Sequence, residues 1–335
     1  MNSIENKWYA NQAGLFTLAL RLVVGWTYFS AFWRRLIIDN KLIPEEAGYI
    51  GEKFNHFLPH ALGIKPIIEY LVLNPDKLQA AMIAFTIIEA IVGLFMMLGL
   101  FSRLMSVGVF SLAMGILLGS GWIGTTCLDE WQIGVLGVAT GFVLFLTGSS
   151  SYSMDQLLIN KKVSFTNNKW FLWMGSGPVN VPKQSILVGS LAIFGLTLFT
   201  NQHFHGGVFG TLHNKSVKPK LEITQTHFET KNRVLYFDLM RVEGADVYGS
   251  FLIEMEVFDA QNRLIKKWDM KDLSSMPQEQ IKNHYVAKIK PGVHSLILPL
   301  GAKATMELQL NTTEIPKKIR LTDISGTQWE SIVDN

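Results

Sequence analysis

The chain has 335 residues, of which 48% are hydrophobic and 17% are charged, with a formal net charge of +3 and one cysteine. A single cysteine excludes an intramolecular disulfide and any all-cysteine metal site. Neither half of the chain is basic enough to indicate nucleic-acid binding.

Five apolar runs of roughly 17–22 residues are each long enough to cross a hydrocarbon core of about 30 Å. They are residues 14–33, 80–101, 104–123, 131–148 and 185–202. Between Ala80 and Gly148, only four residues are charged: Glu89, Arg103, Asp129 and Glu130. Such a low density of charge predicts membrane spans and not a soluble domain.

The C-terminal part has a different character. From His203 to Asn335 the chain carries 17 Lys and Arg against 16 Asp and Glu, as in an ordinary soluble domain. Short alternating stretches punctuated by turn residues predict a β-sandwich of seven or eight strands. In one stretch, FLIEMEV, alternation places Phe251, Ile253, Met255 and Val257 on one face and Leu252 on the other.

The expected architecture is therefore an α-helical membrane bundle, with a four-helix core and a fifth linking span, followed by an all-β sandwich domain. The expected boundaries are a membrane domain at 1–160, a cytoplasmic linker at 161–184, the fifth span at 185–202 and the sandwich at 203–335.

Charge distribution predicts the orientation. Residues 149–184 are net basic, with Lys161, Lys162, Lys169 and Lys183 against Asp155, so the positive-inside rule places this loop in the cytoplasm. The N-terminus is then cytoplasmic and the C-terminal domain extracytoplasmic, and the expected location is the inner (cytoplasmic) membrane of the cell. Arg34 and Arg35 oppose this rule only mildly, because residues 34–77 have balanced charge.

Cys127 is the first candidate for chemistry. It lies in GWIGTTCLDEW, before an expected helix start, where free backbone N–H groups favour a thiolate. The nearby carboxylates of Asp129 and Glu130 act in the opposite direction, and they are also candidates for proton transfer. The alternative is a small buried residue with no chemical role.

Arg34 and Arg35 end the first span. A guanidinium matches oxyanions in shape and charge, which makes the two residues candidate substrate ligands. The alternative is that they extend to lipid headgroups. Within the spans, Arg21 and Glu89 require partners, because an unpaired charge at mid-membrane costs about 2.5–3.5 kcal/mol. By depth, these two residues could pair across the bundle as an ion pair that stabilises the fold. The equal alternative is that Glu89 belongs to a proton path or contacts a quinone head.

The histidines offer weaker candidates. His56 and His60 lie four residues apart, but Pro59 between them argues against a regular helix, so substrate contact is favoured over metal binding. His203, His205 and His213 are expected to be interfacial or loop residues, and no metal site is predicted.

Aromatic residues gather near the expected span ends, as in an interfacial belt. Trp122 and Trp131 are the candidates for stacking on a quinone ring. Glycines in the third and fourth spans predict close helix packing: Gly108, Gly115, Gly119, Gly134, Gly137 and Gly141.

Several stretches together resemble a known family. LRLVVGWTYFSAFWRR, KFNHFLPHALGI and GSGWIGTTCLDEWQIG are similar to the DoxD-type membrane subunit of thiosulfate:quinone oxidoreductase, over roughly residues 14–160. GGVFGTLHNKS and the strands after it resemble the DoxA-type subunit, over residues 200–332.

This resemblance implies oxidation of thiosulfate to tetrathionate, with quinone as the electron acceptor, and no flavin, haem or Fe–S motif is evident. It supplies no catalytic residues, so the candidates above come from their chemistry alone. Two alternatives stay open: an oxidase of sulfide or small thiols, and a non-catalytic scaffold that docks an extracytoplasmic partner. Lipid is an expected partner, and a homo-oligomer or an additional membrane subunit stays open.

Overall fold

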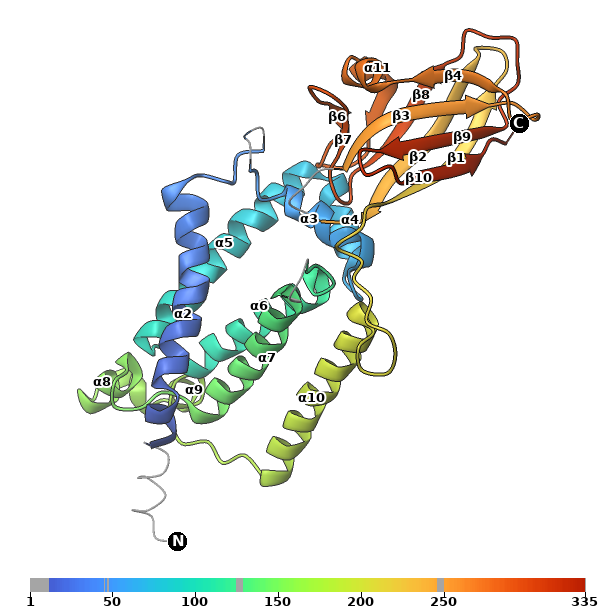
Figure 1. The fold of residues 1–335 in the computed structure, drawn as a ribbon. Helices are drawn as coiled ribbons and strands as arrows, with labels where there is room; N and C mark the ends of the chain where they lie inside the picture. The colour runs from blue at the N-terminus through green and yellow to red at the C-terminus, as the bar shows by residue number, and fades with distance from the viewer. Residues whose placement is uncertain (1–11, 45, 47, 125–128, 246–249, 335) are drawn as a thin grey trace. The chain divides into compact units, whose positions relative to one another are not determined.

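The computed structural model describes residues 12–44, 46, 48–124, 129–245 and 250–334 (Figure 1). They form two compact units, each interrupted in sequence. The helical unit falls within residues 1–50, 79–121 and 128–213. The second unit falls within residues 51–78, 122–127 and 214–335, and it contains the β-strands.

Four of the described helices are long and apolar enough to cross a membrane. They are α5 (Pro75–Leu98), α6 (Ser102–Ser120), α7 (Asp129–Thr147) and α10 (Lys183–His205). Each corresponds to an expected span, and the ends differ by a few residues because polar residues continue the helices. Shorter helices connect α7 to α10: α8 (Met154–Asn160), η3 (Ser164–Asn167) and α9 (Lys169–Met174).

The first expected span, residues 14–33, corresponds to a shorter helix. Helix α2 (Leu18–Phe32) has 15 residues and runs directly into a six-residue π-helix, η1 (Trp33–Ile38). This unbroken helical path from Leu18 to Ile38 is about 30 Å long at ~1.5 Å per residue. That this first expected segment spans the membrane stays a prediction, and the length of the helical path is compatible with it.

Small residues set the packing of the helices. A Cβ added at Gly134, Gly137 and Gly141 of α7 would lie 2.8, 2.6 and 2.7 Å from atoms of Leu117, Ala113 and Phe110 of α6, respectively. The residue numbers on α7 rise while those of their contacts on α6 fall, so the two helices are antiparallel and closely packed. The predicted close packing at these three glycines is confirmed. The prediction for Gly115 is wrong, because a Cβ there would meet nothing within 4 Å.

The strands of the second unit form two antiparallel sheets, consistent with a sandwich (Figure 1). The first has the order β1-β2-β8-β5, with bounds Lys220–Glu229, Val234–Glu243, Lys303–Gln309 and Ile281–Asn283. The second has the order β10-β9-β3-β7-β6, with bounds Gln328–Ile332, Lys318–Asp323, Ser250–Phe258, Leu296–Leu298 and Lys290–Pro291. β4 (Leu264–Trp268) also pairs with β3, and α11 (Met270–Ser274) follows it. The described strands outnumber the seven or eight expected, because three short ones interrupt the chain between α11 and β8.

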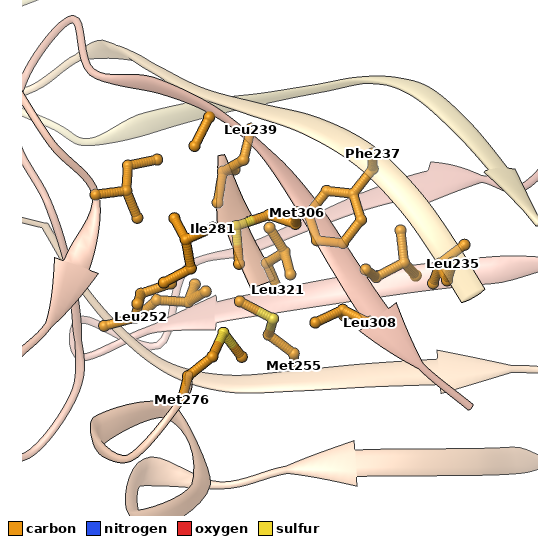
Figure 2. Close-up of a cluster of buried hydrophobic side chains, with 14 of the residues drawn as sticks. Leu235, Phe237, Leu239, Leu252, Met255, Met276, Ile281, Met306, Leu308 and Leu321 are labelled. Atoms are coloured by element: carbon orange, nitrogen blue, oxygen red, sulfur yellow. The ribbon is translucent and has the colours of Figure 1, made fainter. Parts of the chain in front are cut away.

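Alternating residues of both sheets build one hydrophobic core (Figure 2). On β2, Leu235, Phe237 and Leu239 are all fully buried, as a period of two requires. Met255 and Met306 come from the opposing sheets and are also fully buried. Burial of this apolar surface is the main force that holds the sheets together.

The alternation expected along β3 is wrong in its first half. Leu252 is fully buried, while Phe251 and Ile253 are only partly buried. The pairing with β9 shifts between Leu252 and Glu254, which marks a β-bulge. The extra residue reverses the side-chain alternation, so Leu252 joins Met255 in the core.

A helical segment belongs to the second unit. It comprises α3 (Glu52–Phe57), η2 (Leu58–His60) and α4 (Lys65–Leu73). Asn55 is fully buried, accepts a hydrogen bond from the Ala287 N–H at 3.0 Å and donates one to the Gly301 carbonyl at 3.3 Å. The Tyr285 hydroxyl donates to Glu69 at 3.0 Å, which fixes α4 as well.

Candidate functional site

A buried ion pair lies inside the helical unit. Nη1 of Arg35, from η1, is 2.5 Å from Oε2 of Glu89, from α5, and 3.1 Å from the Thr86 hydroxyl. The side chains of Arg35 and Glu89 are 14% and 6% exposed. The Arg35 guanidinium also lies 5.7 Å from the centre of the Phe85 ring. A charge held this far from water needs such partners, since an unpaired one costs several kcal/mol.

The expected pairing of Glu89 with Arg21 is wrong. Arg21 is one turn from the start of α2 and donates to the Tyr152 carbonyl at 2.6 Å, with the carboxylate of Asp155 as its electrostatic partner. Asp155 is fully buried and accepts hydrogen bonds from the backbone of Phe101 and Ser102, which ties the α5–α6 turn to α8. Arg21 therefore interacts with the residues near α8, at one end of the bundle, while Arg35 forms the ion pair with Glu89.

The two adjacent arginines have different surroundings. Arg34 is exposed and its Nε donates to the Ser30 carbonyl at 3.3 Å, whereas the charge of Arg35 is neutralised by Glu89. The π-helix contributes to this difference, because its wider turn changes the direction of successive side chains. The prediction that both arginines hold one anion stays untested.

Aromatic rings line the same helix near this ion pair. Phe29 contacts Trp26, Phe32 and Trp33, with ring centres 6.2, 5.6 and 6.1 Å away. Trp26 and Trp33 are 57% and 44% exposed. A flat apolar molecule in the membrane could stack on these rings, next to the hydrogen-bonding groups of Arg35 and Glu89.

In the second unit, His60 occupies a charged environment. Its Nε2 is 3.5 Å from Oε1 of Glu243 on β2, and its ring meets the edge of Trp122 at 4.8 Å between centres. Burial, together with the ammonium groups of Lys215, Lys65 and Lys220, lowers the pKa of His60 to about 4. His60 is therefore neutral at pH 7, and its approach to Glu243 is not an ion pair.

The remaining histidine candidates are placed as follows. His56 is 8% exposed and belongs to α3. Among the described residues, no group of three or more His, Cys, Asp or Glu is arranged to hold a metal ion. His205 ends α10 fully buried, with Nε2 2.9 Å from the Gly121 carbonyl and its ring next to Trp131. No sequence pattern indicated this burial, because His205 stands at the end of an apolar run beside glycines.

The segment that leads to Cys127 is held by the second unit as far as the structure describes it. Trp122 is fully buried and its indole N–H donates to the Phe57 carbonyl at 3.1 Å. The Gly124 N–H donates to the Ser216 hydroxyl at 3.0 Å, and that hydroxyl also donates to the Gly124 carbonyl. Cys127 itself lies outside the described residues.

The other candidates of this stretch begin α7. Asp129 and Glu130 lie in its first turn, where the helix dipole favours carboxylates. Trp131 is partly buried, and its indole N–H donates to the Thr200 hydroxyl on α10 at 3.0 Å. Trp131 thus links two apolar helices, α7 and α10.

Comparison with known families explains both parts of the chain. A family model described as "TQO small subunit DoxD" matches residues 16–196, and one described as "TQO small subunit DoxA" matches residues 204–332, where TQO is thiosulfate:quinone oxidoreductase. No solved structure matches the chain. The four apolar helices fall within the first match or at its end. The chain is therefore an integral membrane protein that belongs to the DoxD family, with a DoxA domain fused to it in the same polypeptide.

Proposed function

We propose that this protein oxidises thiosulfate to tetrathionate and reduces a membrane quinone. Two thiosulfate dianions lose two electrons and become one tetrathionate dianion, while the quinone takes up two electrons and two protons and becomes a quinol. The observation that carries the proposal is the presence of both TQO small-subunit families in one chain.

The Arg35–Glu89 pair is our candidate for the quinone site. The Arg35 guanidinium has more donors than Glu89 and Thr86 use, so it would also donate to a quinone carbonyl. Glu89 would supply protons to the reduced ring, and the exposed Trp26 and Trp33 would contact it from the lipid side. The alternative for this pair is a purely structural role.

Cys127 would carry the sulfur chemistry. Its thiolate would form an S–S bond to the terminal sulfur of thiosulfate, with two electrons passing to the quinone. The terminal sulfur of a second thiosulfate would then attack the sulfane sulfur of this adduct, which lies between the cysteine sulfur and the sulfonate. The cysteine thiolate leaves, and the product is tetrathionate. Atoms and charges balance over the two steps, and Asp129 and Glu130 would exchange protons with the medium.

We further propose that the N-terminus is cytoplasmic and that the DoxA domain is extracytoplasmic. This orientation requires α2 and η1 to form a fifth span, which their continuous helical path supports. Arg34 and His60 would then lie on the side from which thiosulfate arrives.

The test is quinone reduction by the purified chain in detergent, with thiosulfate, sulfide and a small thiol offered separately. Cys127→Ser should abolish reduction by thiosulfate, while Glu89→Gln should lower it with little effect on thiosulfate binding. Gly115→Ala is a matched control in a neighbouring helix, since an added Cβ there meets no atom within 4 Å.

Other results would favour other functions. Reduction by sulfide or a thiol alone would identify an oxidase of those compounds. No reduction with any donor, in a folded protein supplied with its lipid, would favour the scaffold. Full activity of Cys127→Ser would refute the role of the cysteine.

A further inference from the structure

Three lysines gather around His60 in the second unit. We call Lys65, Lys215 and Lys220, together with His60 and Glu243, the lysine cradle. The five residues come from three separate parts of the chain: the η2–α4 segment, the stretch before β1 with the first residue of β1, and the last residue of β2.

Hydrogen bonds place Lys65 and Lys215 beside His60 and Glu243, respectively. Nζ of Lys65 donates to the carbonyl of Pro59, the residue before His60, at 3.2 Å. The carbonyl of Lys215 accepts from the N–H of Gly244, the residue after Glu243, at 2.9 Å.

Lys220 completes the cradle from the first strand. It stands directly opposite Glu243 in the pairing of β1 with β2. Strand pairing therefore brings Lys220 to Glu243, while the hydrogen bonds of Lys65 and Lys215 place these two residues beside His60 and Glu243.

The cradle has an excess of positive charge. Three ammonium groups face one carboxylate, and His60 is neutral near pH 7 because burial and the lysines lower its pKa to about 4. The guanidinium of buried Arg241 lies close by, with hydrogen bonds to the carbonyls of Glu243 and Ala245. The three lysines and Glu243 alone give a net charge near +2, which attracts dianions.

His60 provides a further indication of a missing ligand. Its Nε2 is buried and makes no hydrogen bond among the described residues, although Oε1 of Glu243 is 3.5 Å away. Buried polar atoms normally have one. An anion among the lysines would favour the protonated imidazole, and Nε2–H would then donate to it.

The cradle also lies next to the segment that leads to the only cysteine. Trp122 packs its edge against His60, and Gly124 is bound through Ser216, the neighbour of Lys215. A small anion in the cradle would thus be held beside Trp122 and Gly124, which shortly precede Cys127 in the sequence.

We propose that the lysine cradle binds a divalent sulfur oxyanion of the thiosulfate class. This inference rests on the proposed function for the identity of the anion. Glu243 opposes the bound charge, which keeps the affinity moderate and allows exchange.

A lipid phosphate has the same tetrahedral oxyanion chemistry. The α4 helix next to Lys65 exposes Ile67, Tyr70 and Leu73, as a helix at a membrane surface does. The experiment must therefore separate a free sulfur oxyanion from a lipid headgroup.

The experiment measures equilibrium binding of radiolabelled thiosulfate to the purified full-length chain, at fixed ionic strength. Removing one charge about 8 Å from a dianion should weaken binding roughly fivefold in a water-like dielectric, so we expect this loss for Lys65→Gln and Lys220→Gln. Glu243→Gln should strengthen binding by a similar factor, a gain that misfolding does not produce. Lys218→Gln, in the same exposed stretch, is the matched control and should bind as the unmodified chain does.

Equal affinity in the unmodified chain and both lysine variants would overturn the proposal, and so would an equal loss in Lys218→Gln. Repeating the measurement in nanodiscs separates the two anion sources. Unchanged lysine-dependent binding of thiosulfate in zwitterionic and anionic lipid supports the sulfur oxyanion. Complete displacement of thiosulfate by anionic lipid at physiological proportions identifies a headgroup site and overturns it.

Quinone reduction measured in parallel distinguishes this proposal from the proposed function. Lysine-dependent binding without any quinone reduction would preserve the cradle and refute the oxidoreductase. If the lysine variants instead bind thiosulfate and reduce quinone as the unmodified chain does, the oxidoreductase function stands and the lysine cradle is refuted.

Discussion

Breaking the Arg35–Glu89 pair should destabilise the protein unequally, depending on which partner is removed. Both side chains are largely buried, so the loss of one partner leaves the other charge uncompensated, at a cost of about 3–5 kcal/mol. Glu89→Gln leaves a guanidinium that does not lose its proton at any accessible pH. Arg35→Gln leaves a carboxyl group that becomes neutral by binding a proton, so its cost should be smaller and should decrease at low pH.

The assay is reversible unfolding in detergent, followed by circular dichroism between pH 5 and 8. Glu89→Gln should lower the transition midpoint by roughly 10 °C, at ~2–4 °C per kcal/mol. The double variant should recover much of this loss, because no charge is then left unpaired. Thr86→Val is a control that removes the hydroxyl contacts with Arg35 and with the Met82 carbonyl, each worth about 1 kcal/mol, and leaves the ion pair in place.

Equal destabilisation by the two single variants at every pH would refute this reasoning. Additive effects in the double variant would also refute it, because they would show that the two groups do not interact.

Three further predictions concern packing, pH and a buried amide. Gly93→Ala should destabilise the bundle by about 1–3 kcal/mol, since its Cβ would lie 2.4 Å from the Phe29 backbone nitrogen, while Gly115→Ala should be neutral or stabilise its helix by up to ~1 kcal/mol. The pKa of His60 is lowered from 6.5 to about 4 in the folded state, so the unfolded chain binds this proton more tightly. The contribution of His60 to the free energy of unfolding should therefore be fully present above pH 6.5 and fall by at most about 3 kcal/mol as the pH drops to 4. Asn55→Ala should cost about 2–4 kcal/mol, because it leaves a buried N–H and a buried carbonyl without partners.

All three predictions are tested by measuring the midpoint of the unfolding transition, and each has a control variant. Similar midpoints for the two alanine variants would contradict the close approach at Gly93. His60→Asn should remove the difference in stability between pH 4 and 6.5 that belongs to His60, and an unchanged pH profile would exclude it as the source. Asn74→Ala removes an exposed amide that bonds to a nearby carbonyl, so a cost equal to that of Asn55→Ala would show that burial is not the cause.

Hydropathy allowed the sequence to predict the helices, because each long helix must present apolar side chains to lipid along its whole length. The scarcity of charge between Ala80 and Gly148 therefore located α5, α6 and α7 within a few residues. Alternation predicted the strands of the sandwich in the same way, except at Leu252, where a bulge adds one residue to one strand only. Such a shift depends on the partner strand, so the pattern of one strand does not contain it.

The candidate site was less accessible to sequence reasoning, because its charges find partners that are distant along the chain. The sequence showed that Glu89 needs a cation, but depth alone favoured Arg21, and only the π-helix and the packing of α2 on α5 select Arg35. Composition likewise distinguished an apolar helical part of the chain from a C-terminal part with ordinary charge content. The convergence of three lysines on His60 was decided by the tertiary structure, since strand pairing and a docked helix bring together charges that the sequence keeps far apart.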